Sequence, residues 1–491
     1  MADCFRYLYR NKFFFSISRI DVAPVYDGTD KSFDYSAYNS VNSKNPTLDA
    51  LTAYKNAGMT ILLPQDAVSV SAGSSSGSHS QEISDLKSLM DNALTVGLSK
   101  VVVTDYRLIM LCRETSQGGV IGTGNFTNTD ILGYRTSKFA DENALDSYVY
   151  SCLREYATHN AFYGVFLQDE PEYNVAEAYG QVYKSIKRVS KRLSREIYVQ
   201  MNLFPMESTA YKFYSSNQNP TSGIDDLVTR YKSYVNLFLD ATGCDYLQYD
   251  QYPVTANKGI IGEYIRGFQV AAEICRERGI ELKHIAQTTG YNNNGNPNRR
   301  VITEADAHWI NNVMLGFGVK DILYYTYCQK DSVSNEQVID GSNFLNTDGT
   351  TTELYSFMRK IIKENNDFAN VILNFNYNSS KLFSGSACSC PQTNYITSGI
   401  LKKVTGVTVN KEHTLVTELY DAEQNRYMYM LQNVENPIEK GTETQTATIT
   451  FSSEFAYAAV FVNGVRTDYD LNNGSLTLTQ TAGNAAFIIP Y

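Results

Sequence analysis

Apolar positions in the first three quarters of the chain follow two alternating patterns. Short runs rich in β-branched and aromatic residues predict buried strands, and longer stretches with apolar residues at every third or fourth position predict amphipathic helices. The expected strands are 20–26, 60–64, 100–105, 162–168, 197–202, 246–249, 282–287 and 321–327. The expected helices are 47–57, 82–96, 144–158, 175–193, 224–239, 260–278, 304–315 and 353–364.

These elements form eight β-then-α units. Parallel strands joined by helices build either an open doubly wound sheet or a closed barrel. An open sheet that binds a dinucleotide carries a glycine-rich turn directly after a strand, and no expected strand is followed by such a turn. We therefore expect an α/β fold, with a (β/α)8 TIM barrel over residues 1–375.

The period changes near the C-terminus. Residues 446–451 and 475–479 alternate between apolar and polar side chains, as half-buried strands do. Asn463-Gly464 and Asn473-Gly474 favour hairpin turns, because Asn and Gly tolerate a positive φ. The sequence thus predicts a small all-β sandwich domain over residues 376–491.

Three long polar segments follow expected strands. Residues 69–80 are rich in Ser and Gly, 113–139 follow the third strand, and 291–300 are rich in Asn and Gly. In an α/β barrel the active site is built from the loops that follow the strands. These segments therefore predict a substrate cleft at the C-terminal ends of the strands.

Composition narrows the range of partners. The formal charge is −10 and long runs of Lys or Arg are absent, which argues against nucleic acid as the main partner. Residues 1–20 hold a short apolar cluster flanked by charges, which predicts neither a signal peptide nor a membrane span. Localisation stays open between a secreted or surface protein whose leader has been removed and a cytoplasmic one. The eight cysteines are widely spread, and buried free thiols are expected.

Candidate site residues are polar side chains at expected strand ends. They are Asp27, Asp66, Asp105, Arg107, Gln168, Asp169, Glu170, Asn202, Tyr249, Asp250, Tyr252, Gln287, Tyr325, Tyr327 and Gln329. The histidines and cysteines show no metal-ligand spacing, and no nucleophilic serine elbow follows a strand. We expect no metal and no cofactor. Carboxylate chemistry on a neutral polyhydroxyl substrate remains, and glycoside hydrolysis needs such a pair of groups.

The segment from Phe166 to Pro171 resembles the TIM-barrel glycoside hydrolases, which commonly carry their acid/base Glu at the end of strand four. The resemblance implies Glu170 as general acid/base and Asp169 as its partner carboxylate. The retaining enzymes of clan A place their nucleophile Glu at the end of strand seven, but residues 284–289 contain no carboxylate.

Two identities of the second catalytic group stay open. The adjacent Asp169 and Glu170 resemble the substrate-assisted N-acetylhexosaminidases, in which the Asp orients the acetamido group of the substrate; those enzymes tend to line that pocket with Trp, and this chain has only Trp309. The other solution is Asp250 as nucleophile or base, with Asp66 and Asp105 as lesser candidates.

The remaining candidates are expected to bind sugar hydroxyls or rings. They are Asp66, Asp105, Arg107, Gln168, Asn202, Tyr249, Tyr252, Gln287, Tyr325 and Tyr327. The expected partner is thus a carbohydrate substrate. A non-catalytic carbohydrate-binding barrel is the main alternative, and a glycosyltransferase is a weaker one because it usually calls for a nucleotide-binding sheet.

Overall fold

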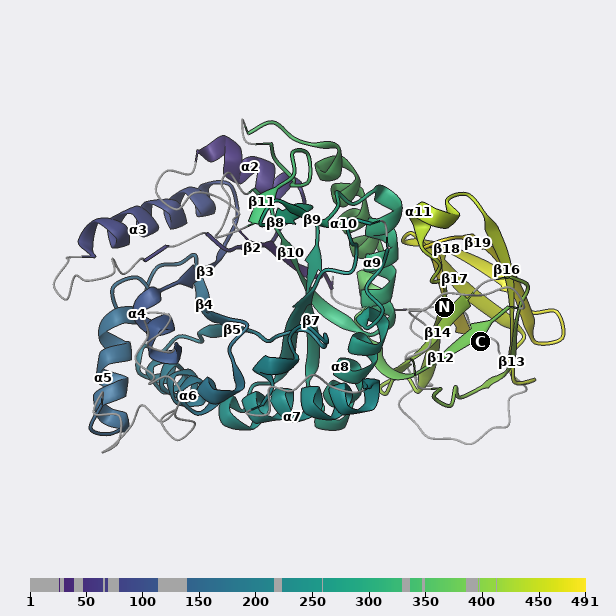
Figure 1. Cartoon of the computed structure of the whole chain (residues 1–491), viewed down its shortest axis with the longest axis horizontal. Helices are drawn as coiled ribbons and strands as arrows, with labels where there is room; N and C mark the ends of the chain where they lie inside the picture. Colours follow the sequence, from purple (N-terminus) through teal and green to yellow (C-terminus); the bar gives the residue numbers. More distant parts are fainter. Residues whose placement is uncertain are drawn as a thin grey trace, which may run out of the picture.

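A computed structural model covers the chain, and it describes residues 26, 31–38, 47–64, 67–68, 79–113, 139–215, 223–257, 259–328, 336–346, 349–385, 396, 398–411 and 413–491. Two parts of different architecture follow each other along the sequence. The first combines parallel strands with helices, and the second, drawn in light green and yellow in Figure 1, consists mainly of antiparallel strands.

The parallel strands form two four-stranded sheets. The first has the order β1 (Asp34–Ala37), β10 (Val319–Tyr325), β7 (Glu281–Gln287) and β6 (Tyr246–Gln251). The second has the order β2 (Ile61–Leu62), β3 (Lys100–Thr104), β4 (Phe162–Asp169) and β5 (Tyr198–Asn202). Within the described residues the strand ladders do not close into a single barrel.

Backbone contacts nevertheless connect the two sheets at both ends. The Thr60 amide donates to the Tyr35 carbonyl over 2.9 Å, and the Leu203 amide donates to the Gln248 carbonyl over 3.0 Å. Between the sheets lies one apolar cluster to which both contribute, namely Ile61, Leu63, Val102, Phe166, Ile285 and Leu323. The two sheets therefore share a core.

Helices follow the strands along the chain, and Figure 1 shows them around the outside of the parallel strands. They are α2 (Leu48–Asn56), α3 (Ser80–Thr95), α4 (Tyr106–Ile109), α5 (Glu142–Leu153), α6 (Ala176–Arg192), α7 (Ile224–Thr242), α8 (Tyr264–Arg278), α9 (Glu304–Gly316) and α10 (Glu353–Ile372), with 3-10 turns η1 (Met110–Cys112), η3 (Tyr173–Val175) and η4 (Tyr211–Phe213). Side chains of Thr47, Asp141, Thr303 and Thr352 cap helix N-termini. No helix of the described residues is long and apolar enough to cross a bilayer.

Most expected strands of the parallel part are confirmed to within two residues, but the first is not. Of residues 20–26 the structure describes only Tyr26, which lies outside any strand, and the strand that pairs with β10 is Asp34–Ala37. The residue that follows the first strand is therefore Tyr38. The candidates Asp27, Asp66 and Gln329 lie outside the described residues.

The expected loop at 291–300 is largely a β-hairpin. Strands β8 (Tyr291–Asn293) and β9 (Asn296–Arg299) are antiparallel, and β11 (Glu336–Val338) extends them to a three-stranded sheet. The turn residues Asn294 and Gly295 have φ of 51° and 77°. Two consecutive positive φ values are the requirement of a type I′ turn, which explains the Asn-Gly pair.

The C-terminal part contains two antiparallel sheets. One joins β12 (Asn376–Ser384), β14 (His413–Asp421), β15 (Arg426–Asn433), β20 (Ala485–Pro490), β17 (Tyr457–Val462) and β18 (Val465–Asp470). The other joins β13 (Val404–Val409), β16 (Thr444–Phe451) and β19 (Ser475–Thr481). Apolar residues of both sheets, such as Leu431, Ile449 and Leu476, form one core cluster.

Helices α9 and α10 lie between the parallel strands and the C-terminal sheets (Figure 1). The indole N–H of the buried Trp309, on α9, donates to the Val434 carbonyl over 3.1 Å. The Asn312 side chain donates to the Gly483 carbonyl over 3.0 Å, and α11 (Pro437–Lys440) packs nearby. The boundary expected between residues 375 and 376 falls between α10 and β12 and stays a prediction.

One buried histidine leads to a prediction on stability. His284, on β7, has no exposed surface and packs against Tyr249 and Phe268. Burial lowers the pKa of His284 to about 3, whereas an unfolded histidine titrates near 6.5. As the pH falls, the unfolded chain therefore takes up a proton on this histidine before the folded chain does. The free energy of unfolding then falls by up to about 1.4 kcal/mol for each pH unit below about 6.5.

We expect a His284→Phe variant to lose less stability than the parent chain between about pH 6.5 and pH 3. Urea unfolding at a series of pH values measures this difference. The matched control is His159→Phe, since His159 is partly exposed and bonds Asp91. Identical pH dependence of the parent and His284→Phe chains would contradict the prediction.

Candidate active site

Three acidic residues meet at the C-terminal ends of β4 and β6. Asp169 is the last residue of β4 and Glu170 follows it, while Asp250 is the penultimate residue of β6. Strand β5 lies next to β4, and its end is bonded to β6 through Leu203. These three carboxylates, expected from the sequence at two separate strand ends, are brought into one group.

Asn202, at the end of β5, connects the three acidic residues. Its side-chain amide donates to Oδ1 of Asp169 over 2.7 Å and to Oδ1 of Asp250 over 3.0 Å. Its backbone carbonyl accepts the amide N–H of Glu170 over 3.0 Å. Asn202 has no exposed surface and Asp250 is buried, so the bond between these two side chains is shielded from bulk water.

The backbone at Glu170 is in the left-handed region, with φ of 44°. A residue other than glycine pays of order 1–3 kcal/mol for such a conformation, and residues of this kind cluster at functional sites. The following residue, Pro171, accepts a hydrogen bond from the buried Tyr234 hydroxyl over 2.6 Å. The turn after β4 is therefore held on both sides of Glu170.

The side chains of Glu170 and Asp250 lie close enough for each to act on the pKa of the other. Where two carboxyl groups share a site, the pKa of one of them is strongly raised, so that this group keeps its proton. Tyr252 lies beside Asp250 and acts to lower its pKa, and the Tyr252 ring stacks on Tyr325 with centroids 5.2 Å apart. Asp250 is buried, Glu170 is half-buried and Asp169 is exposed.

The surroundings raise the pKa of all three carboxyl groups. Burial raises the pKa of Glu170 well above its ordinary value, and the negative charges of Asp250 and Asp169 raise it further. Burial and the charge of Asp169 raise the pKa of Asp250 to about 7. Desolvation by neighbouring protein atoms also raises the pKa of Asp169, although Asn202 and Tyr38 donate to it.

A cavity of about 330 Å³ opens beside Asp169 and Glu170. Its lining consists of Arg113, Gln168, Asp169, Glu170, Glu172, Val175, Phe204 and Phe213. The rings of Phe204 and Phe213 stack with centroids 4.5 Å apart and planes only 6° apart. The cavity thus combines carboxyl groups, one guanidinium group and an aromatic wall, and small-molecule sites commonly mix polar groups with such apolar walls.

The sequence interpretation missed two residues of this group. Tyr38 donates to Asp169 over 3.4 Å, and it was missed because the first strand was expected at 20–26. The alternation of the buried Phe33, Tyr35 and Ala37 was the available signal for the true strand. Glu207, in the loop after β5, bonds Gln251 over 3.3 Å, and its charge contributes to the raised pKa of Glu170.

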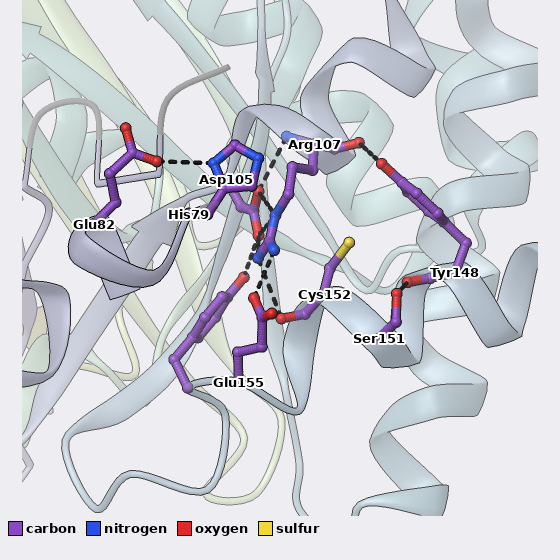
Figure 2. A network of polar contacts seen from close by, with 9 residues as sticks. His79, Glu82, Asp105, Arg107, Tyr148, Ser151, Cys152 and Glu155 are labelled. Atoms are coloured by element: carbon purple, nitrogen blue, oxygen red, sulfur yellow. Dashed lines mark hydrogen bonds and ion pairs between the residues drawn. The ribbon is translucent and has the colours of Figure 1, made fainter. Parts of the chain in front are cut away.

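Asp105 and Arg107 belong to a separate network, shown in Figure 2. The Arg107 guanidinium contacts Asp105 at 2.7 Å and Glu155 at 2.5 Å, and the Tyr156 hydroxyl donates to Asp105 over 2.9 Å. Asp105 also accepts from the Arg107 amide as the N-cap of α4. The charged groups of Asp105 and Arg107 therefore have partners within the protein itself. A role of these two residues in substrate binding stays a prediction.

Other expected sugar-binding residues are distributed over several environments. Tyr252 and Tyr325 stack beside Asp250, and Gln168 lines the cavity. Tyr249 packs against Phe268, on α8. The Gln287 amide forms two bonds with the backbone of Val254, and Tyr327 packs on Tyr54 and Phe344. Their contacts with substrate stay predictions.

The chain is similar to known proteins in the course of its backbone, and not in its sequence. No family model and no curated protein sequence matches the chain. It is similar to a family 27 β-L-arabinopyranosidase from Geobacillus stearothermophilus, with 11% identity, 95% of this chain and 97% of that chain covered, and a TM-score of 0.49. An α-amylase from Geobacillus thermoleovorans has 11% identity, coverage of 94% and 98%, and a TM-score of 0.46. A family 30 xylanase from Clostridium acetobutylicum has 13% identity, coverage of 94% and 95%, and a TM-score of 0.40.

Proposed function

We propose that this protein is a glycoside hydrolase with Glu170 as general acid/base. The observation that carries the proposal is the group of three carboxyl groups at the ends of β4 and β6, in which Asn202 donates to both Asp169 and Asp250 and accepts the Glu170 amide. Cleavage of a glycosidic bond needs one carboxylic acid that protonates the leaving oxygen and a second group that stabilises or captures the oxocarbenium-like centre. With the proton on Glu170, this trio offers a carboxylic acid and a neighbouring carboxylate.

The raised pKa of Glu170 supports its role as the acid. A general acid has to hold its proton near the working pH, and an ordinary Glu has lost it there. Burial and the neighbouring charges of Asp250 and Asp169 keep the proton on Glu170. Since Asp250 titrates at about 7, activity that needs ionised Asp250 should fall as the pH drops below this value.

The cavity supports a sugar as the ligand. Stacked Phe204 and Phe213 provide an apolar wall for the C–H face of a pyranose ring. Arg113 and Glu172 supply a hydrogen-bond donor and an acceptor for hydroxyl groups on the same cavity. Its volume of about 330 Å³ is at the small end of ligand pockets, which suits one or two sugar rings.

The proposal includes a (β/α)8 barrel as the scaffold, followed by a β-sandwich domain. The hydrogen bonds of Thr60 to Tyr35 and of Leu203 to Gln248 support it, because they give the strands the cyclic order of a barrel. In such a barrel the strand ends that carry Asp169 and Asp250 face the same mouth. The shared core of the two antiparallel sheets supports the sandwich.

We propose retention of configuration, with Asp250 or the substrate itself supplying the nucleophile. Carboxyl groups lie about 5–5.5 Å apart in retaining enzymes and about 6.5–9.5 Å apart in inverting ones. The mutual effect of Glu170 and Asp250 on their pKa values supports the closer arrangement. In the first mechanism Glu170 protonates the leaving oxygen while an Asp250 oxygen bonds to the anomeric carbon. Water activated by Glu170 then cleaves this ester and restores both carboxyl groups. In the second mechanism Asp169 orients an acetamido group of the substrate.

Incubation of the full chain with a broad panel of glycans and aryl glycosides tests the proposed function, with new reducing ends as the readout. If Asp250 is the nucleophile, we expect azide to restore turnover of an activated aryl glycoside by Asp250→Asn. If the substrate assists, we expect tight binding of an acetamido-thiazoline inhibitor and its loss in Asp169→Asn. Turnover that both Asp variants retain in full would contradict both mechanisms.

A non-catalytic carbohydrate-binding protein is the second candidate. The observation that favours it is the end of β7, where Gln287 is bonded to the Val254 backbone and no carboxylate is present. Retaining hydrolases of the group that the sequence resembles carry their nucleophile there. Glycan binding without release of reducing sugar across the panel would support this candidate and overturn the first.

A further inference from the structure

Hydrogen-bond donors are unequally distributed among the three carboxyl groups of the candidate site. Asp169 accepts from Asn202 and from Tyr38, and Asp250 accepts from Asn202 and has Tyr252 beside it, which also acts to lower its pKa. Within the described residues, the neighbours that act on the Glu170 carboxyl group are Asp250, Asp169 and Glu207, which are themselves carboxyl groups. The two aspartates are thus supplied with N–H and O–H donors, and the glutamate is not.

Charges on the surrounding elements act in the same direction. Glu207, after β5, adds a further negative charge near Glu170, whereas the positive charge of Arg113 acts on Asp169. Hydrogen bonds to a charged acceptor are stronger than those between neutral groups, so donors favour ionised carboxylates. A proton shared within the trio is therefore most stable on Glu170.

We propose that Asn202 is the positioning residue of the site: by donating one N–H to Asp169 and one to Asp250, it holds both as carboxylates and leaves the proton to Glu170. The hydrogen bond from the Glu170 amide N–H to the Asn202 carbonyl fixes the position of Glu170 relative to the two aspartates. This inference rests on the proposed function for its catalytic meaning, but the distribution of protons that it describes does not depend on any activity. It gives Asn202 a role different from the sugar contact expected from the sequence.

The first test is infrared titration of the full chain in the absence of substrate, which detects the C=O band of protonated carboxyl groups. In the parent chain we expect the band that persists above pH 7 to disappear in Glu170→Gln. In Asn202→Ala we expect a second protonated carboxyl group at this pH, which disappears when Asp250→Asn or Asp169→Asn is added. An Asn202→Ala spectrum identical to that of the parent would overturn the proposal.

A matched control is Asn311→Ala, since Asn311 is also a buried amide but exchanges hydrogen bonds with Asn365 on α10. It should leave the carboxyl titration unchanged. Asn202→Ser serves as the second variant if Asn202→Ala does not fold, because its shorter side chain cannot bridge both aspartates, and the same extra protonated group is expected.

The second test is the pH profile of kcat/KM on any glycoside that the panel identifies. In Asn202→Ala the loss of a hydrogen bond to a charged carboxylate should move the acid limb of this profile to a pH about one unit higher. The value of kcat/KM should then be about tenfold lower at acid pH and little changed at alkaline pH. A uniform loss at all pH values would indicate a merely structural role and overturn the proposal. Absence of turnover would count against the proposed function, while the infrared result would still decide the role of Asn202.

Discussion

Glu170→Gln is expected to lower kcat by about 10²–10⁴-fold on glycosides with poor leaving groups, because the amide has no proton to give to the departing oxygen. The loss should be much smaller on activated aryl glycosides, whose leaving groups depart without protonation. The variant should fold, since Gln keeps the size of Glu and, like the protonated Glu170, carries no charge beside Asp250 and Asp169. Steady-state kinetics on a matched pair of good and poor leaving groups measures the difference.

Glu177→Gln provides the control for this experiment. Glu177 is an exposed carboxylate on α6, seven residues along the chain and outside the lining of the cavity. It should leave kcat within a factor of two. Full activity of Glu170→Gln on the poor leaving group would remove Glu170 from the proposed mechanism and move the role of acid to Asp250 or Asp169.

Trp309→Ala is expected to lower the free energy of unfolding by about 3–5 kcal/mol, as large-to-small changes of buried aromatic residues do. Trp309 is 1% exposed, stacks on Tyr264 with centroids 5.6 Å apart, and donates to Val434 in the C-terminal part. The substitution therefore removes apolar burial within the first part and a hydrogen bond between the two parts. Urea unfolding followed by circular dichroism measures the loss.

The same residue reports on whether the two parts unfold together. As the single tryptophan of the chain, Trp309 supplies its own fluorescence signal at this contact. We expect the fluorescence and circular dichroism transitions of the parent chain to coincide, because the contact joins both parts. Tyr469→Ala is the control, since Tyr469 is 39% exposed on β18 and should change stability by less than about 0.5 kcal/mol. Separate transitions would contradict the expectation of joint unfolding.

Strand ends that carry carboxylates were predictable from local pattern. The buried run 162–168 followed by Asp169 and Glu170, and the run 246–249 followed by Asp250, lie close to β4 and β6 of the structure. Strands with strong apolar character leave few alternatives for the position of the residues that follow them. The first strand escaped detection because the apolar residues near 20–26 competed with the shorter alternation at 33–37.

The roles of the individual residues at the C-terminal ends of the parallel strands were not predictable in the same way. Asp105 and Arg107 have the residue types and the strand-end position of substrate-binding groups, but they pair with Glu155 and Tyr156, which are about fifty residues away in sequence. Tyr249 and Gln287 face neighbours on α8 and after β6. Periodicity assigns a residue to a strand end, but the partner that its side chain meets depends on distant segments.

The sequence by itself determined the alternation of strands and helices after the first strand, the change to a mainly β C-terminal part and the presence of Asp169, Glu170 and Asp250 at strand ends, because these follow from contacts within a few residues. Only the tertiary structure decided which carboxyl group meets which donor. Asn202 lies 33 residues after Asp169 and 48 before Asp250, and pairing of β4 with β5 and of β5 with β6 brings the three together. The distribution of donors and charges that leaves the proton on Glu170 is therefore a property of the fold.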